Sequence, residues 1–143
     1  MRRLADVFAF CLLLASFSVH CEENAPAHER VVKQFVAAFN AQDVDAMSEL
    51  VTEDVQWLSI SADKISVETN GKSALRSAMS DYFNGCPTCR SELTAVIATP
   101  NRVSAIEVAS WKSKDEARRQ SGVCVYEFSG GLIRRVYYFP SEK

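Results

Sequence analysis

This sequence lacks an excess of charge of either sign. Its 143 residues hold 16 lysines and arginines against 18 aspartates and glutamates, which gives a formal net charge of −2 at neutral pH. A mildly acidic chain offers no electrostatic reason to expect nucleic acid or an anionic membrane surface as a partner. Internal repeats and low-complexity segments are absent as well, and the length suits one domain.

Histidine is scarce, and this limits the metal chemistry that can be expected. The chain has only His20 and His28, and His20 falls in an N-terminal segment that we expect to be removed. His28 and Cys124 offer no second pair of ligands at the spacing of a zinc site. The sequence therefore predicts no bound metal. We also expect no cofactor, because export would place the domain away from nucleotide cofactors. His28 begins the first predicted helix, where a surface or capping role is the simpler expectation.

A hydrophobic run long enough to cross a membrane, about 20 residues, is also missing. The longest apolar run spans residues 7–17, interrupted by one serine, and follows two arginines. This order is the layout of a secretory signal peptide. We predict a signal peptide over residues 1–21, a polar linker over residues 22–27, and a protein that is periplasmic or secreted. A buried N-terminal helix is the alternative, but the run shows no amphipathic stripe.

Cys21 raises a second question about the N-terminus. In a lipoprotein, a cysteine at the cleavage point becomes the lipidated first residue. His20 stands just before this cysteine, where processing needs a small residue. We therefore expect no membrane contact unless Cys21 is lipidated.

Export decides how the five cysteines are interpreted. Cys11 would leave with the signal, whereas Cys86, Cys89 and Cys124 lie in the domain. In an oxidising compartment the close pair Cys86–Cys89 is the expected disulfide, which leaves Cys124 free and buried. Two free thiols and a redox-active pair are the alternatives. A redox CxxC motif begins a helix, whereas this one follows a predicted helix and leads into a strand.

Hydrophobic spacing predicts three helices. Apolar residues at steps of one and three mark helices over 28–41 and 74–83. A shorter helix runs from Val44 to Val51, with Asp43 as its N-cap. All three precede the longest β-rich part of the chain.

The remaining elements are strands, expected over 55–60, 65–68, 90–99, 102–111, 120–128 and 132–139. The charged stretch 112–119 is expected to form a solvated hairpin tip. Together these elements predict an α+β domain in which three N-terminal helices pack against a curved, mostly antiparallel sheet.

Four segments carry a resemblance to a known family. Residues 31–46 read as a helix that ends in an Asn-x-x-Asp turn before a short helix, and residues 50–57 as an acidic turn into a strand. Residues 71–75 resemble a glycine opening of a third helix, and residues 131–136 a last strand. In this order the segments resemble the nuclear-transport-factor-2-like (NTF2-like) superfamily, including its SnoaL-like members, over residues 28–140.

The resemblance implies a cone-shaped domain with a small-molecule cavity and a homodimer formed through the open sheet face. It implies little about function, because this fold hosts enzymes, ligand binders and interaction modules. Ketosteroid isomerases of the superfamily pair a carboxylate base with an oxyanion hole of a tyrosine and a protonated aspartate. Here those positions fall at Phe35, at or next to Ser59, and at or near Cys124. That chemistry is therefore not expected, and whether the chain is an enzyme stays open.

Glu107 is the acid with the most informative position. Strand alternation places Val103, Ala105, Glu107, Ala109 and Trp111 on one face. If that face lines the cone, Glu107 is a carboxylate in an apolar pocket, where it can act as an acid or a base. If the faces are reversed, Glu107 is exposed and has no such role.

Aromatic side chains dominate the pocket that we expect. Its predicted lining is Phe35, Trp57, Ser59, Met79, Tyr82, Phe83, Trp111, Cys124 and Tyr126. The first hypothesis is an exported protein that binds a small apolar ligand. The second is a cofactor-independent isomerase, lyase or hydrolase that uses Glu107 with Ser59 or Tyr126. The third is an interaction module without a ligand.

Overall fold

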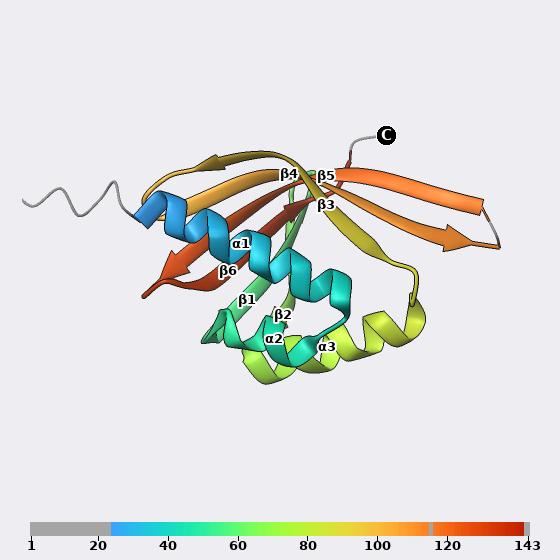
Figure 1. The fold of residues 1–143 in the computed structure, drawn as a ribbon, viewed down its shortest axis with the longest axis horizontal. Coiled ribbons are helices and arrows are strands. Elements are labelled where there is room, and N and C mark those ends of the chain that lie inside the picture. The colour runs from blue at the N-terminus through green and yellow to red at the C-terminus, as the bar shows by residue number, and fades with distance from the viewer. Residues whose placement is uncertain (1–23, 115, 142–143) are drawn as a thin grey trace, which may run out of the picture.

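The computed structural model describes residues 24–114 and 116–141, so the predicted signal peptide, residues 1–21, lies outside the described residues. Three helices and six strands follow one another along the chain (Figure 1). In chain order they are α1 (Asn24–Ala41), α2 (Val44–Glu49), β1 (Val51–Ser61), β2 (Lys64–Asn70), α3 (Lys72–Gly85), β3 (Arg90–Ala98), β4 (Arg102–Ser113), β5 (Glu116–Ser129) and β6 (Leu132–Phe139).

The strands form one sheet in the order β2-β1-β6-β5-β4-β3. All neighbours are antiparallel except β1 and β6, which run parallel. The sheet is curved, and the three helices cover its concave side (Figure 1). The predicted α+β class, with helices against a mostly antiparallel sheet, is confirmed at this level.

The core forms where α1 meets the inward face of the sheet. Val32 and Phe35 lie on one side of α1 because residues three or four apart share a helix face. They pack in one cluster with Val103, Tyr126 and Val136 from β4, β5 and β6, all of which are at most 2% exposed. Burial of this apolar surface is what holds α1 against the sheet.

The start of β1 corrects the predicted second helix. Asp43 caps α2 as expected, since its carboxylate accepts a hydrogen bond from the Ala46 amide at 2.9 Å. The helix ends at Glu49, however, and Val51 lies in β1 rather than in the helix. The physical reason is pairing with a distant strand, because the Ile133 amide donates to the carbonyl of Leu50 at 3.0 Å.

The N-terminal end of α1 corrects two further predictions. Residues 24–27, expected to be linker, are helical. His28 is buried rather than superficial, and its ring stacks on that of Phe128 with centroids 3.9 Å apart. This contact anchors the first turns of the helix to β5. Burial lowers the pKa of His28, and the carbonyl of Pro100 opposes that shift.

The charged hairpin is longer than predicted. Residues 112–119 were expected as a solvated tip, but β4 and β5 stay paired up to Ser113 and Glu116. The hairpin extends beyond the helices (Figure 1). Most of the charged residues of this segment therefore belong to two paired strands that are exposed to water, and not to a loop.

None of the three described helices covers the far face of the sheet (Figure 1). Ile106, Val123 and Phe139 lie there, with exposed fractions of 44%, 45% and 37%. These apolar side chains are on the face through which the expected homodimer would form. The homodimer stays a prediction.

Candidate functional site

A cavity of about 380 Å³ lies between the helices and the concave face of the sheet. Its volume is within the range of roughly 300–1,000 Å³ that small-molecule sites have. Two helices and all six strands contribute to its walls. The lining residues are Phe35, Val36, Phe39, Trp57, Glu68, Thr69, Ala78, Met79, Tyr82, Ser91, Glu107, Ala109, Tyr126 and Tyr138.

Glu107 points into this cavity from β4. Its neighbours across the sheet are Leu93 of β3 and Gly122 of β5. Because side chains alternate along a strand, Val103 and Ala105 on the same face are buried, whereas Ile106 faces outward. The geometric condition for a functional Glu107, an inward carboxylate at a cavity, is therefore met.

Three side chains donate hydrogen bonds to the Glu107 carboxylate. The Ser91 hydroxyl donates to Oε1. The Cys124 thiol lies 3.1 Å from Oε2, and the Tyr126 hydroxyl lies 3.2 Å from the same atom. Since the donors come from β3 and β5 on both sides of β4, they fix the orientation of the carboxylate.

The two donors on β5 keep their protons. Burial raises the pKa of Tyr126 well above its usual value, and the nearby charge of Glu107 raises it further. Burial and then Glu107 also raise the pKa of the Cys124 thiol. Cys124 is therefore an inert donor rather than a nucleophile, because the thiolate is the reactive form.

Two more phenols line the cavity beside Glu107. Burial, followed by the charge of Glu107, raises the pKa of Tyr82. Burial also raises the pKa of Tyr138, with smaller effects from Cys124, Glu107 and Tyr82. Both phenols thus stay neutral. Tyr138 can donate a hydrogen bond to a ligand, and Tyr82, whose hydroxyl donates to the Cys89 sulfur, can accept one.

Tyr82 also links the cavity to a disulfide. Cys86 and Cys89 are joined, with Cα atoms 5.4 Å apart, in the connection between α3 and β3. The Tyr82 hydroxyl lies 3.3 Å from the Cys89 sulfur. The disulfide thus lies against a residue of the cavity wall, while Cys124 is free and buried.

Five of the nine predicted lining residues do line the cavity: Phe35, Trp57, Met79, Tyr82 and Tyr126.

The other four predicted positions lie elsewhere. Phe83 packs in the core with its ring 5.1 Å from that of Phe39. Trp111 lies further along β4, opposite Arg118 in the hairpin. Cys124 is fully buried and meets the site through Glu107. Ser59 lies beyond the irregularity that follows Trp57 in the pairing of β1 with β2, and is not among the lining residues.

Sequence reasoning missed several lining residues. Val36 and Phe39 follow Phe35 on α1, and their spacing predicts a buried helix face rather than a cavity wall. Ser91 reaches Glu107 because it pairs with Ala109, two residues along β4. The sequence does not show that register. In contrast, Phe39 lies four residues after Phe35, which does indicate that both side chains share one face of α1.

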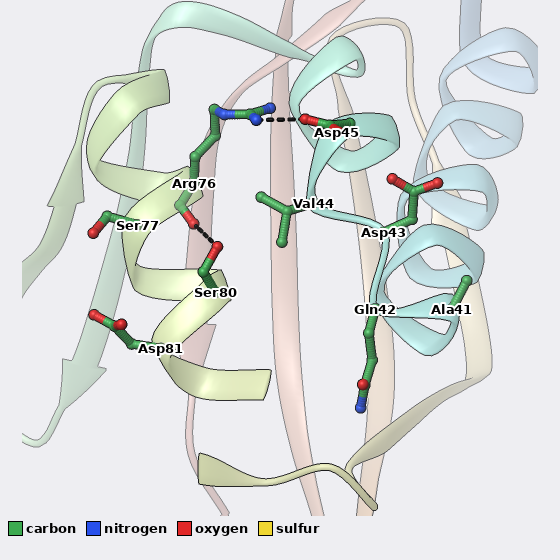
Figure 2. Close-up of a pocket in the computed structure, with 9 residues that line it drawn as sticks. All are labelled: Ala41, Gln42, Asp43, Val44, Asp45, Arg76, Ser77, Ser80 and Asp81. Carbon is green, nitrogen blue, oxygen red and sulfur yellow. Dashed lines mark hydrogen bonds and ion pairs between the residues drawn. The ribbon is translucent and has the colours of Figure 1, made fainter. Parts of the chain in front are cut away.

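A larger hollow of about 740 Å³ lies between α2 and α3 on the surface (Figure 2). The only cation among its lining residues is already paired, since Arg76 binds the Asp45 carboxylate and donates to the Ser48 hydroxyl at 2.6 Å. Asp43 is occupied as the helix cap. Its lining has no aromatic residue, so we place the functional site at Glu107 instead.

Within residues 24–114 and 116–141, no group of three or more His, Cys, Asp or Glu residues could hold a metal ion. No helix in this part of the chain is long and apolar enough to cross a membrane.

Comparison with known proteins identifies the domain. A family model described as the SnoaL-like domain matches residues 32–136. No curated protein matches the chain in sequence.

Several solved structures share the fold. Bal32a, from a soil-derived mobile gene cassette, has a TM-score of 0.72 at 20% identity, over 83% of this chain and 92% of that one. A proposed ketosteroid isomerase from Kribbella flavida has a TM-score of 0.65 at 20% identity, over 84% and 82%. A proposed polyketide cyclase from Xanthomonas campestris has a TM-score of 0.60 at 23% identity, over 81% and 91%. At these identities the likeness extends to the fold alone.

Proposed function

The chain belongs to the SnoaL-like family, and on that basis we propose that it binds a small, largely apolar molecule in the cavity around Glu107. The observation that carries the proposal is a cavity with aromatic walls and one fixed carboxylate. Small-molecule sites combine predominantly apolar walls with a few placed polar groups. Phe35 and Trp57 supply apolar surface, and Glu107, Tyr82 and Tyr138 supply the polar groups.

Binding of 2-naphthylmethanol, a neutral two-ring probe, tests this function. We expect a dissociation constant below about 1 mM, typical of a small ligand that is well enclosed. Ala109 lines the cavity, so Ala109→Phe should fill it and weaken binding at least tenfold. Titration calorimetry gives the measurement.

The matched control is the same substitution at Ala74, which lies exposed on α3 outside the cavity. Ala74→Phe should bind the probe as the unmodified protein does. Equal binding by both variants would place the probe elsewhere and contradict the proposal.

Proton transfer is a second candidate function, and the position of Glu107 favours it. Tyr138 can donate a hydrogen bond to a substrate oxygen, while Glu107 takes a proton. A positioned base contributes roughly 10²–10⁴-fold to such a step. This would be a cofactor-independent isomerase, lyase or hydrolase. Ser59, an earlier candidate partner, is not in the cavity lining, whereas Tyr126 serves by fixing Glu107.

The base-promoted ring opening of 5-nitrobenzisoxazole tests this candidate, because it needs only a carboxylate and an apolar pocket. We expect a rate about 10²-fold above that of acetate at equal concentration. Glu107→Gln keeps the size of the side chain and should remove this excess. A rate that is unchanged in Glu107→Gln would exclude Glu107 as the base.

A further inference from the structure

We infer that the ligand of this cavity is an organic cation: a protonated amine attached to an apolar group of about the size of one or two aromatic rings. The inference rests on the proposed binding function and specifies its ligand class. It follows from the charges of the lining, the free acceptor position on Glu107, and the unpartnered hydroxyl of Thr69.

The charged residues of the lining are all acidic. Glu107 lies inside the cavity and Glu68 at its exposed edge, and the lining contains no lysine, arginine or histidine. The nearby cations of α3 face other partners, since Lys72 binds Glu53 at 2.7 Å and Arg76 binds Asp45. A carboxylate ligand would therefore meet Glu107 without a counter-ion, whereas an ammonium would meet an opposite charge.

The Glu107 carboxylate retains room for one more donor. A carboxylate has about four acceptor positions. Cys124 and Tyr126 fill Oε2, and Ser91 takes one position on Oε1. The remaining position on Oε1 has no donor among the described residues. A hydrogen bond between an ammonium and a carboxylate is charge-assisted and stronger than one between neutral groups.

Thr69 supplies a second, independent sign of a ligand. It lines the cavity and is 8% exposed, and its hydroxyl has no hydrogen-bond partner within the described ranges. Buried polar groups are usually hydrogen-bonded, so an orphan hydroxyl at a cavity calls for a partner. An ammonium has three N–H donors and no acceptor, which suits a cavity whose free polar positions are acceptors.

The walls complete the match to an organic cation. Phe35, Trp57, Tyr82 and Tyr138 line the same cavity as Glu107. Aromatic rings attract a cation through the negative potential of their faces, most strongly when the cation is desolvated. The same rings hold the apolar part of the ligand. A small inorganic cation would not fill the cavity and would leave most of these aromatic side chains without contact to a ligand.

Three matched probes test the inference: 2-naphthylmethylamine, a cation at pH 7.5; 2-naphthylmethanol, which is neutral; and 2-naphthoate, an anion. Calorimetry should give at least tenfold tighter binding for the amine than for the alcohol, and the weakest binding for the naphthoate. Glu107→Gln should remove the preference of the amine over the alcohol. Glu92→Gln is the matched control, because Glu92 is exposed on β3 outside the cavity and the charge change is the same.

Each outcome decides between the two proposals. Equal binding of amine and alcohol would overturn the cation inference and leave the binding function in place. A preference for the amine that persists in Glu107→Gln but falls in Glu92→Gln would place the cation at the surface and overturn the inference. If no probe binds, both the inference and the binding function fail.

Discussion

Phe35→Ala is expected to lower the free energy of unfolding by about 4 kcal/mol, within the range known for truncation of a buried phenylalanine. Phe35 is 2% exposed, and its ring lies 6.3 Å from that of Trp57 and 6.4 Å from that of Tyr126. The loss combines the transfer of the ring to water with a hole that α1 and β5 cannot close. Urea denaturation, followed by far-ultraviolet circular dichroism, measures the change.

Two further variants serve as comparisons for Phe35→Ala. Phe35→Leu should lose only about 1–2 kcal/mol, because most of the volume is kept. Phe139→Ala, at a residue that is 37% exposed on the far face, should lose less than Phe35→Ala. A loss at Phe35 no greater than that at Phe139 would contradict the role of Phe35 as the contact between α1 and the sheet.

Gly122→Ala is expected to lower the free energy of unfolding by about 3 kcal/mol, as overpacking of a rigid site does. Gly122 lies opposite Glu107 on the inward face of β5. A Cβ atom there would lie 2.8 Å from the carbonyl oxygen of Phe139 and 2.8 Å from Cε2 of Tyr138. The carbonyl belongs to the paired strand β6 and cannot move aside without breaking the ladder.

The same change should also alter the cavity, because Tyr138 lines it. Displacement of the Tyr138 ring is therefore expected to change the affinity for 2-naphthylmethanol. Gly85→Ala is the control, since nothing lies within 4 Å of a Cβ at Gly85. That variant should be neutral or more stable, because alanine favours a helix over glycine by about 1 kcal/mol. Equal losses at both glycines would show that the steric account of Gly122 is wrong.

The local elements of this fold could be predicted because they depend on neighbours in the sequence. The spacing of Val32, Phe35 and Val36 predicts the buried side of α1, and Asp43 signals the start of α2. Alternation along β4 places Glu107 on the same face as Ala105. These features follow from the periods of helix and strand alone.

Contacts between distant strands could not be predicted in this way. Ser91 meets Glu107 only because β3 pairs with β4 in one register, which includes an irregularity between Leu93 and Ala95. A shift by one residue would turn Ser91 to the other face. Val51 was assigned to a helix for the same reason, since its pairing with Ile133 joins positions far apart in the chain.

The place of β6 in the sheet has a consequence for how the protein folds. β6 is the last strand that the structure describes, yet it lies between β1 and β5 and joins the two halves of the sheet. Synthesis from the N-terminus therefore leaves β1 and β5 with open edges until residues 132–139 have left the ribosome. Such long-range closure slows folding. The two halves of the sheet are thus joined only once β6 has inserted between β1 and β5, and until then each of these strands presents an unpaired edge.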